Sequence, residues 1–152
     1  MARAHRLQAL AVTGNEQAIE QAATALRQQI VPARNAYLQS YLHFSLGVAD
    51  LLQGRPAAAL THAAMSIERA LAGGCQAATL VPGLLHAQAL ADLARDTEAA
   101  DALARSLASW KRHGYHLIAA AAHLEQTRLH LRQGAPAAAR ASLDAARRLL
   151  PA

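Results

Sequence analysis

Histidine is the residue with which this sequence could most readily do chemistry, since eight occur in 152 residues and imidazole binds metals and moves protons near neutral pH. His116, His123 and His130 recur every seven residues. Seven residues of α-helix rise about 10.5 Å, so these three side chains are too far apart to share one metal ion. There is no His-Glu-x-x-His motif and no histidine pair four residues apart. The spacing therefore predicts no metal site.

Catalytic patterns are equally scarce. No Gly-x-Ser-x-Gly nucleophile motif occurs, and the carboxylates Glu98 and Asp101 share one helical turn on a face that the pattern predicts to be solvated. Cys75, the sole cysteine, follows Gly73-Gly74 with no base pattern beside it. The chain also contains no Gly-x4-Gly-Lys-Ser/Thr phosphate loop. We therefore predict a non-enzymatic protein with no catalytic residues and no cofactor.

The elements that would position any site are helices. The chain holds 41 Ala and 24 Leu but only four Val and four Ile, and aromatic residues make up 3%. Ala and Leu favour helix, whereas the residues that favour strands are too few for a sheet. The sequence predicts an all-α fold and argues against disorder, because 53% of residues are hydrophobic and 16% charged.

The chain repeats itself with a period of about 40 residues. Segments 51–60 and 131–140 share a Gln-Gly-x-Pro-Ala-Ala-Ala core, and segments 12–19 and 93–101 look like further copies. The copies align on Gly14, Gly54, Asp96 and Gly134, which follow one another at nearly equal intervals. Each mark should end one helix and start another.

The residues around these marks support helix termini. Gly54 and Gly134 should adopt positive φ as helix caps, and Pro56 and Pro136 suit the first turn of the next helix. Asn15 and Thr97 are expected N-caps. The predicted helices are 2–12, 15–30, 33–53, 55–72, 77–95, 97–113, 115–133 and 135–150. They form hairpins over about 1–30, 33–72, 77–113 and 115–150, in one domain that spans 1–152 and stacks as a solenoid.

The pattern Leu46-Gly47-x-Ala49-x4-Gly54-x4-Ala59 resembles the core of the tetratricopeptide repeat, in which a small residue lets two helices pack closely. Ala89 and Thr127 hold the matching position in later copies. The resemblance implies a right-handed α-α superhelix. The long period and the Gln-Gly turn look more like the sensor domain of MalT-type regulators, ATP-dependent transcription activators of the LuxR class.

Superposing the repeats places polar residues on one stripe of the first helix of each hairpin, which is otherwise apolar. The candidate ligand-binding residues of this stripe are His43, Asp50, Gln88, Asp92, His123, Gln126 and His130. The tetratricopeptide register instead places a more apolar face in the groove. Its residues are Tyr41, Phe44, Val48, Gly83, His86, Leu90, Ala121, Leu124 and Arg128. Either stripe would bind a protein, a peptide or a small effector on the concave side.

The distribution of charged and apolar residues indicates which kinds of partner the chain could bind. The net charge is +5, and fourteen of the fifteen basic residues are Arg. They are scattered rather than gathered in a stripe with aromatics, which predicts no direct contact with nucleic acid. The single cysteine and the lack of a long apolar run predict a cytoplasmic protein with no membrane contact.

The solenoid shows no polar capping element, so the segment is expected to be an excised part of a longer protein. Self-association through exposed terminal faces would follow. The expected exposed residues are Leu7, Leu10, Ile19, Ala22, Leu26, Leu143, Leu149 and Leu150. The leading interpretation is the sensor or interaction domain of a MalT-type regulator. The alternatives are a general peptide-binding tetratricopeptide scaffold and, third, a small all-α enzyme.

Overall fold

A computed structural model describes residues 7, 9, 10, 12, 13, 15–30, 35–112 and 114–150. The described part is all-α, with one short 3-10 helix and no strand. Its elements are α2 (Glu16–Ile30), α3 (Ala36–Leu52), α4 (Pro56–Ala72), η2 (Gln76–Thr79), α5 (Leu80–Asp92), α6 (Asp96–Arg112), α7 (His116–Arg132) and α8 (Pro136–Leu149). The all-α prediction is confirmed.

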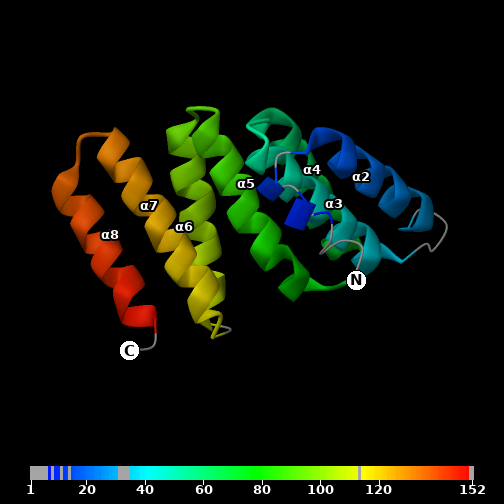
Figure 1. The fold of residues 1–152 in the computed structure, drawn as a ribbon. Coiled ribbons are helices and arrows are strands. Elements are labelled where there is room, and N and C mark those ends of the chain that lie inside the picture. Colours follow the sequence, from blue (N-terminus) through cyan, green and yellow to red (C-terminus); the bar gives the residue numbers. More distant parts are fainter. Residues whose placement is uncertain are drawn as a thin grey trace.

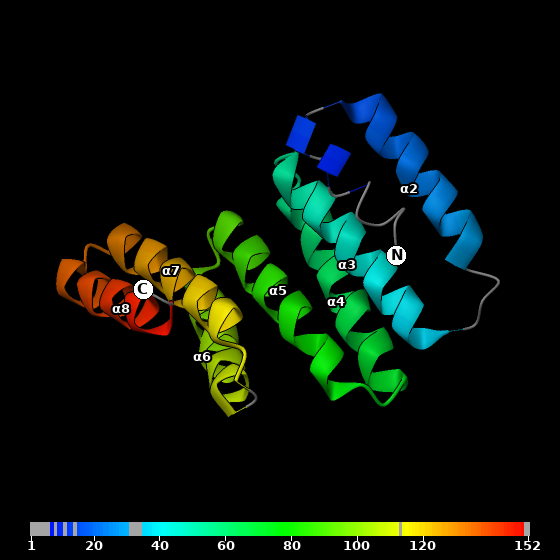
Figure 2. The same cartoon turned by 60° about the horizontal axis from the view of Figure 1, so that its bottom comes forward.

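The helices follow one another in a row, with α2 and α8 at opposite ends (Figures 1 and 2). Each packs mainly against its neighbours in sequence, most extensively within the pairs α3–α4, α5–α6 and α7–α8. Alternate helices also meet, since α5 contacts both α3 and α7. The first helices of the three hairpins therefore lie in one layer.

Helix-ending turns recur at equal intervals, twice per repeat, through the described part from α3 onward. Gly54, Gly74, Ala94, Gly114 and Gly134 all have positive φ, between 58° and 71°. The next residue in each turn donates its N–H to the carbonyl five residues earlier, at 2.8–3.0 Å, which is the long bond of a Schellman motif. The positive φ predicted for Gly54 and Gly134 is confirmed.

The third turn corrects the sequence alignment. The left-handed residue is Ala94, with φ 58°, whereas Asp96 is the first residue of α6. Thr97 therefore lies inside the helix and is not its N-cap. The alignment was wrong because alanine gives no sign of a left-handed conformation, while Asp-Thr-Glu looks like a helix start. With Ala94 as the mark, the turns at Gly54, Ala94 and Gly134 are evenly spaced along the chain.

Other helix termini agree with the sequence. Asn15 accepts a hydrogen bond from the Ala18 N–H at 3.0 Å, as an N-cap should. Pro56 and Pro136 occupy first-turn positions of α4 and α8. The predicted helix 77–95 is shorter, because its first turn is the 3-10 helix η2 and α5 ends at Asp92.

Small residues hold the two helices of each hairpin together at equivalent positions. A Cβ on Gly47 would lie 3.3 Å from the Ala59 carbonyl oxygen and 2.8 Å from Leu85 Cδ2. One repeat later Ala87 and Ala99 are fully buried. Two repeats later the Thr127 hydroxyl lies 3.4 Å from the Ala139 carbonyl oxygen. The close helix approach expected around Gly47 is present, with Ala87 rather than Ala89 in the middle repeat.

The main apolar core belongs to the α5–α6 hairpin and α7. Trp110 and Leu103 are fully buried there, with Leu90 and Leu129 nearly so. The Trp110 indole N–H donates to the Leu80 carbonyl at 3.1 Å, so this buried ring leaves no polar atom unpaired. The core therefore ties α6 to the start of α5.

The N-terminal end corrects another expectation. Leu7 and Ile19 are 0% and 3% exposed and pack with Leu42 and Leu46 of α3, so they are not an open apolar face. They are covered because Leu7 and Ile19 share one buried cluster with these leucines of α3. Leu10 and Ala22 are partly buried in the same cluster, and the side chain of Leu26 lies outside the described residues, as do Gly14, His113 and most of the predicted helix 2–12.

At the C-terminal end, Leu143 is half-buried, Leu149 packs partly against the core and Leu150 is 45% exposed. Among the described helices, none combines the length and the apolar character needed to cross a membrane.

Candidate functional site

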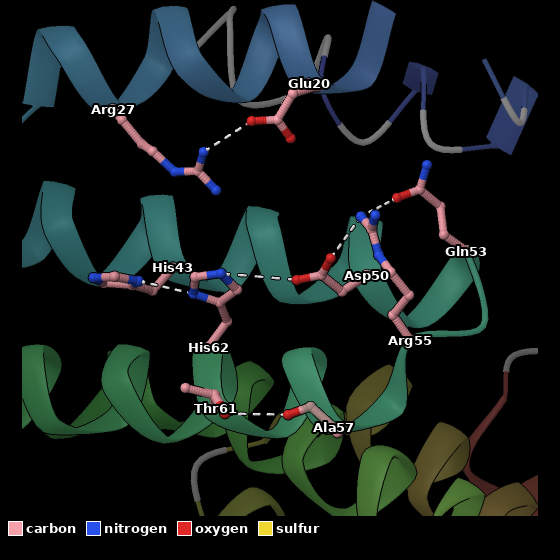
Figure 3. Close-up of polar contacts among 9 residues, drawn as sticks. All are labelled: Glu20, Arg27, His43, Asp50, Gln53, Arg55, Ala57, Thr61 and His62. Carbon is pink, nitrogen blue, oxygen red and sulfur yellow. Dashed lines mark hydrogen bonds and ion pairs between the residues drawn. The ribbon is translucent and has the colours of Figure 1, made fainter. Parts of the chain in front are cut away.

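A partly buried polar group lies between α3 and α4. The Nδ1 atoms of His43 and His62 are 3.2 Å apart, and the two rings stack with centroids 5.4 Å apart. On the far side of His62, Asp50 Oδ2 lies 3.7 Å from Nε2. Figure 3 shows the three side chains in a line along the α3–α4 contact.

The order of this line follows from helix geometry. His43 and Asp50 are seven residues apart on α3 and so share one face, and His62 of the antiparallel α4 reaches between them. Gly47, which lies between the two in sequence, would place a Cβ only 3.3 Å from the His62 Cβ. The missing side chain lets α4 approach α3 closely at His62.

Asp50 also forms an ion pair with an arginine of the turn that follows α3. Arg55 Nη2 lies 2.7 Å from Asp50 Oδ1, and the same guanidinium donates to Gln53 Oε1. The Asp50 side chain is 12% exposed and that of Arg55 is 49% exposed. A nearly buried carboxylate is thus paired with one partner open to solvent, which reduces its desolvation cost.

The pKa of His43 is lowered from 6.5 to about 4, chiefly by burial, with the neighbouring His62, Arg69 and Arg27 acting in the same direction. Burial also lowers the pKa of His62, whereas the Asp50 carboxylate acts in the opposite direction. Both rings are therefore neutral at pH 7. In a neutral pair, one Nδ1 donates a hydrogen to the other.

A second buried polar pair lies further along the same hairpin. The hydroxyls of Ser40 and Ser66 are 3.1 Å apart, and the Ser66 hydroxyl donates to the Ser40 carbonyl at 2.7 Å. Ser66 is fully buried. The α3–α4 contact is therefore polar along much of its length.

The remaining predicted stripe residues lie in other surroundings. His123 is 8% exposed, and its Nδ1 lies 2.9 Å from Gln126 Oε1. Gln88 and His130 are half-buried. The structure thus brings His43 and Asp50 together through His62, and His123 together with Gln126, but places Asp92 in a third cluster.

That third cluster joins two hairpins. Arg128 Nη1 lies 2.6 Å from Asp92 Oδ1 and Arg128 Nη2 lies 2.6 Å from Glu125 Oε1. Arg132 pairs with Asp96 and donates to the Ala91 carbonyl at 2.7 Å. These contacts hold α7 against the C-terminal end of α5.

The corrected repeat register separates the stripe. Asp50 corresponds to Leu90 and His130, whereas Asp92 corresponds to Leu52 and Arg132. Three residues that the sequence analysis did not select, His62, Arg27 and Arg69, complete the first site. They were missed because only the first helix of each hairpin was searched.

An apolar face of the same first helices is open. A cavity of about 210 Å³ between α3 and α5 is lined by Tyr37, Ser40, Tyr41, Phe44, Ala77, Ala78, Val81 and Pro82. On α7, Leu117, Leu124 and Leu131 are 70%, 49% and 61% exposed. Phe44, Leu84 and Leu124 stand at the same place relative to the turns at Gly54, Ala94 and Gly134, and so share one repeat position.

Neither a metal site nor a nucleophile site is assembled among the described residues. The described side chains include no group of three or more His, Cys, Asp or Glu placed to hold a metal ion. Cys75 is half-buried in the turn before η2. The assembled features are thus the histidine line, the ion pairs between hairpins and the apolar face.

Comparison with known proteins adds no assignment: the chain matches no family model, no curated protein and no solved structure.

Proposed function

We propose that this chain is a non-enzymatic recognition module whose hairpins stack as a right-handed, tetratricopeptide-like superhelix. The observation that carries the proposal is the regular recurrence of one Schellman turn at the end of each helix from Gly54 to Gly134. Identical turns joined by helices of similar length repeat one rotation, and repeated rotation builds a solenoid. The contacts of α5 with both α3 and α7 support that stacking.

The apolar face of α3, α5 and α7 is the proposed binding surface. Its leucines on α7 are 49–70% exposed, while the predicted polar residues Asp50 and His123 are buried at 9% and 8%. Several large apolar side chains open to solvent on adjacent helices are typical of a protein-binding surface. This observation favours the tetratricopeptide register over the polar stripe.

The proposed occupant is a peptide segment of a partner protein that carries large apolar side chains on one face. The α3–α5 cavity of about 210 Å³ would accept one such side chain against Tyr41 and Phe44, whose rings lie 6.1 Å apart. The net charge of +5 favours a peptide with acidic flanking residues. A small effector in the same groove is the alternative occupant.

The parent protein would be a MalT-type regulator of the LuxR class, in which this cytoplasmic module senses the signal. A general peptide-binding scaffold in another multidomain protein is the second candidate. The open reading frame that encodes the chain tests this part. A phosphate loop upstream and a helix-turn-helix downstream would support the regulator, and their absence from the full frame would overturn it.

Peptide selection tests the surface directly. Peptides selected on the wild-type protein from a random display library should be enriched in apolar residues at helical or alternating spacing. Leu124→Glu places a charge on the proposed face and should weaken the selected peptides at least about tenfold, because a buried unpaired charge opposes binding. Leu71→Glu is the matched control, since Leu71 is 50% exposed on α4, outside the layer of first helices.

Equal loss in the two variants, with helicity retained in both, would contradict the assignment of the face. Hydrolysis or turnover of a small molecule by the wild-type chain would instead support the third candidate, an all-α enzyme.

A further inference from the structure

A second cavity lies on the opposite side of α3 from the apolar face. It measures about 300 Å³ and is bounded by α2, α3 and α4. Its polar lining residues are Arg27, Gln39, His43, His62 and Arg69. Leu42, 3% exposed, gives it an apolar wall.

The lining of this cavity is positively charged. Arg27 reaches toward α3 from α2 (Figure 3), and Arg69 comes from α4. None of the described residues that line the cavity is an Asp or Glu. Both guanidinium groups lower the pKa of His43, although less than burial does.

The two arginines are weakly held by the protein itself. Arg27 Nη1 lies 3.3 Å from Glu20 Oε1, with the two side chains 44% and 67% exposed. Exposed pairs of this kind contribute little. Within the described part of the chain no ion pair holds Arg69. A ligand could therefore recruit both charges without breaking a strong contact.

The line of His43, His62 and Asp50 determines which nitrogen atoms of the two histidines carry a hydrogen. Asp50 near His62 Nε2 favours a hydrogen on that nitrogen, which leaves His62 Nδ1 as the acceptor. His43 Nδ1 then donates to it, and His43 Nε2 carries a lone pair. Figure 3 shows this second nitrogen of His43 pointing away from His62.

We propose that this cavity binds a small organic anion through a carboxylate or phosphate group, held by Arg27 and Arg69 with Gln39 and a protonated His43 as hydrogen-bond donors. Two cationic side chains from different helices would clamp one anionic group. The anion would favour a proton on His43 Nε2, turning a lone pair that repels it into a donor. This site is independent of the apolar face and does not rest on the proposed peptide partner.

Isothermal titration of the purified full chain at constant ionic strength tests the site. The probes are inorganic phosphate, glucose 6-phosphate and succinate, with glucose as the neutral control. Saturable binding of at least one anion, with no glucose binding, is expected. Preference for glucose 6-phosphate indicates a phosphate ligand, and preference for succinate indicates a carboxylate ligand.

Charge-matched variants locate the binding. Arg69→Gln and Arg27→Gln should each weaken the preferred anion at least about tenfold, because each removes a charge-assisted hydrogen bond. Arg147→Gln lowers the net charge equally on α8, where the Arg147 side chain is 72% exposed, and should leave affinity unchanged. Circular dichroism and thermal unfolding confirm that the variants fold. Equal weakening in all three variants, or no saturation by any anion, would overturn the proposal.

The proton on His43 gives a second readout. Sulfate keeps its charge between pH 7.5 and 5.5, so its affinity reports only protein groups. The charged and titratable groups around His43 are Arg27 on α2, Asp50 beyond His62 on α3, and His62, Glu68 and Arg69 on α4. Sulfate affinity should rise by up to about tenfold per pH unit as pH falls.

His43→Gln should retain sulfate binding and reduce this slope. A wild-type affinity that is unchanged across the range would overturn the role of His43, and the arginine variants would still decide the site.

Discussion

The α3–α4 and α5–α6 hairpins share one backbone plan and fill it with opposite chemistry. At equivalent positions, His43, Asp50 and His62 of the first hairpin stand where the second has Gly83, Leu90 and Ala102. Ser66 of α4 bonds to Ser40 of α3, and Ala70 of α4 is buried, whereas Trp110, the equivalent of Ala70, is the largest buried side chain of the second hairpin.

The difference separates two jobs within one repeat. Turn residues and small contact residues keep their positions in both hairpins, as Gly54 and Ala94 or Ala59 and Ala99 show. The positions between them are free to vary. The second hairpin uses this freedom for apolar packing, while the first uses it for a polar line beside a charged cavity.

The largest effect is expected where the second hairpin is apolar. Trp110→Ala should lower the free energy of unfolding by about 3–5 kcal/mol, because it opens a cavity at a fully buried site and removes the indole hydrogen bond to the Leu80 carbonyl. Urea unfolding followed by circular dichroism measures this.

Leu117→Ala is the control, since Leu117 is 70% exposed and should change stability by less than about 0.5 kcal/mol. If Trp110→Ala lowered the free energy of unfolding by no more than Leu117→Ala does, the buried core of α5–α6 would not be a main source of stability.

The turns give the next effect and link the hairpins. Gly134→Val should destabilise by about 1–2 kcal/mol, because a β-branched residue resists the φ of 68° found there. At Ala94, where φ is 58°, the reverse change Ala94→Gly should raise stability by up to about 1 kcal/mol. Urea midpoints at fixed m-value measure both. If Ala94→Gly lowered the free energy of unfolding instead, the positive φ of Ala94 would not be a source of strain that glycine relieves.

Ala94 also shows how far the sequence alone reaches. The glycines at positions 54, 74, 114 and 134 form a regular series whose missing member falls at position 94. Aligning both turns of each hairpin would have placed it there. When only one turn per hairpin is aligned, Asp96 matches Gly54 and Gly134 better than Ala94 does. The reason is that residues at helix starts have a recognisable chemistry, whereas a left-handed alanine has none.

The site was predictable in smaller part. His43 and Asp50 were identified by superposing the repeats, which places them on one face of the first helix of a hairpin. His62, Arg27 and Arg69 come from two other helices, and their approach depends on how closely α3 and α4 pack at Gly47. The burial of Leu7 and Ile19 was missed for the same reason, because it depends on where the N-terminal segment folds.

The polar line of the first hairpin should make stability depend on pH. The pKa of His43 is about 4 in the folded protein against 6.5 for the free side chain, so the unfolded chain binds more protons between these values. Stability is therefore fully present above pH 6.5 and falls as pH decreases toward 4.

His43→Gln should reduce this dependence by less than one proton, because the imidazole is half-exposed. Urea midpoints from pH 7.5 to 4.5 measure it, with His116→Gln as the exposed control. An identical pH profile in wild type and His43→Gln would contradict the burial of this ring in its neutral form.

The smallest effect concerns the junction between the second and third hairpins, which adds exposed ion pairs to its apolar contacts, whereas the junction at Tyr41 and Phe44 is apolar. Asp92 and Arg128 are 34% and 44% exposed at 2.6 Å, so a double-mutant cycle should give a coupling of about 0.2–1 kcal/mol. Arg128→Ala alone should cost more than Asp92→Ala, because it also leaves Glu125, 9% exposed, unpaired. Half a molar of added salt should weaken the coupling. A coupling near zero together with equal single losses would show that apolar contacts alone hold α7 to α5, and that the two junctions differ in composition but not in how they are stabilised.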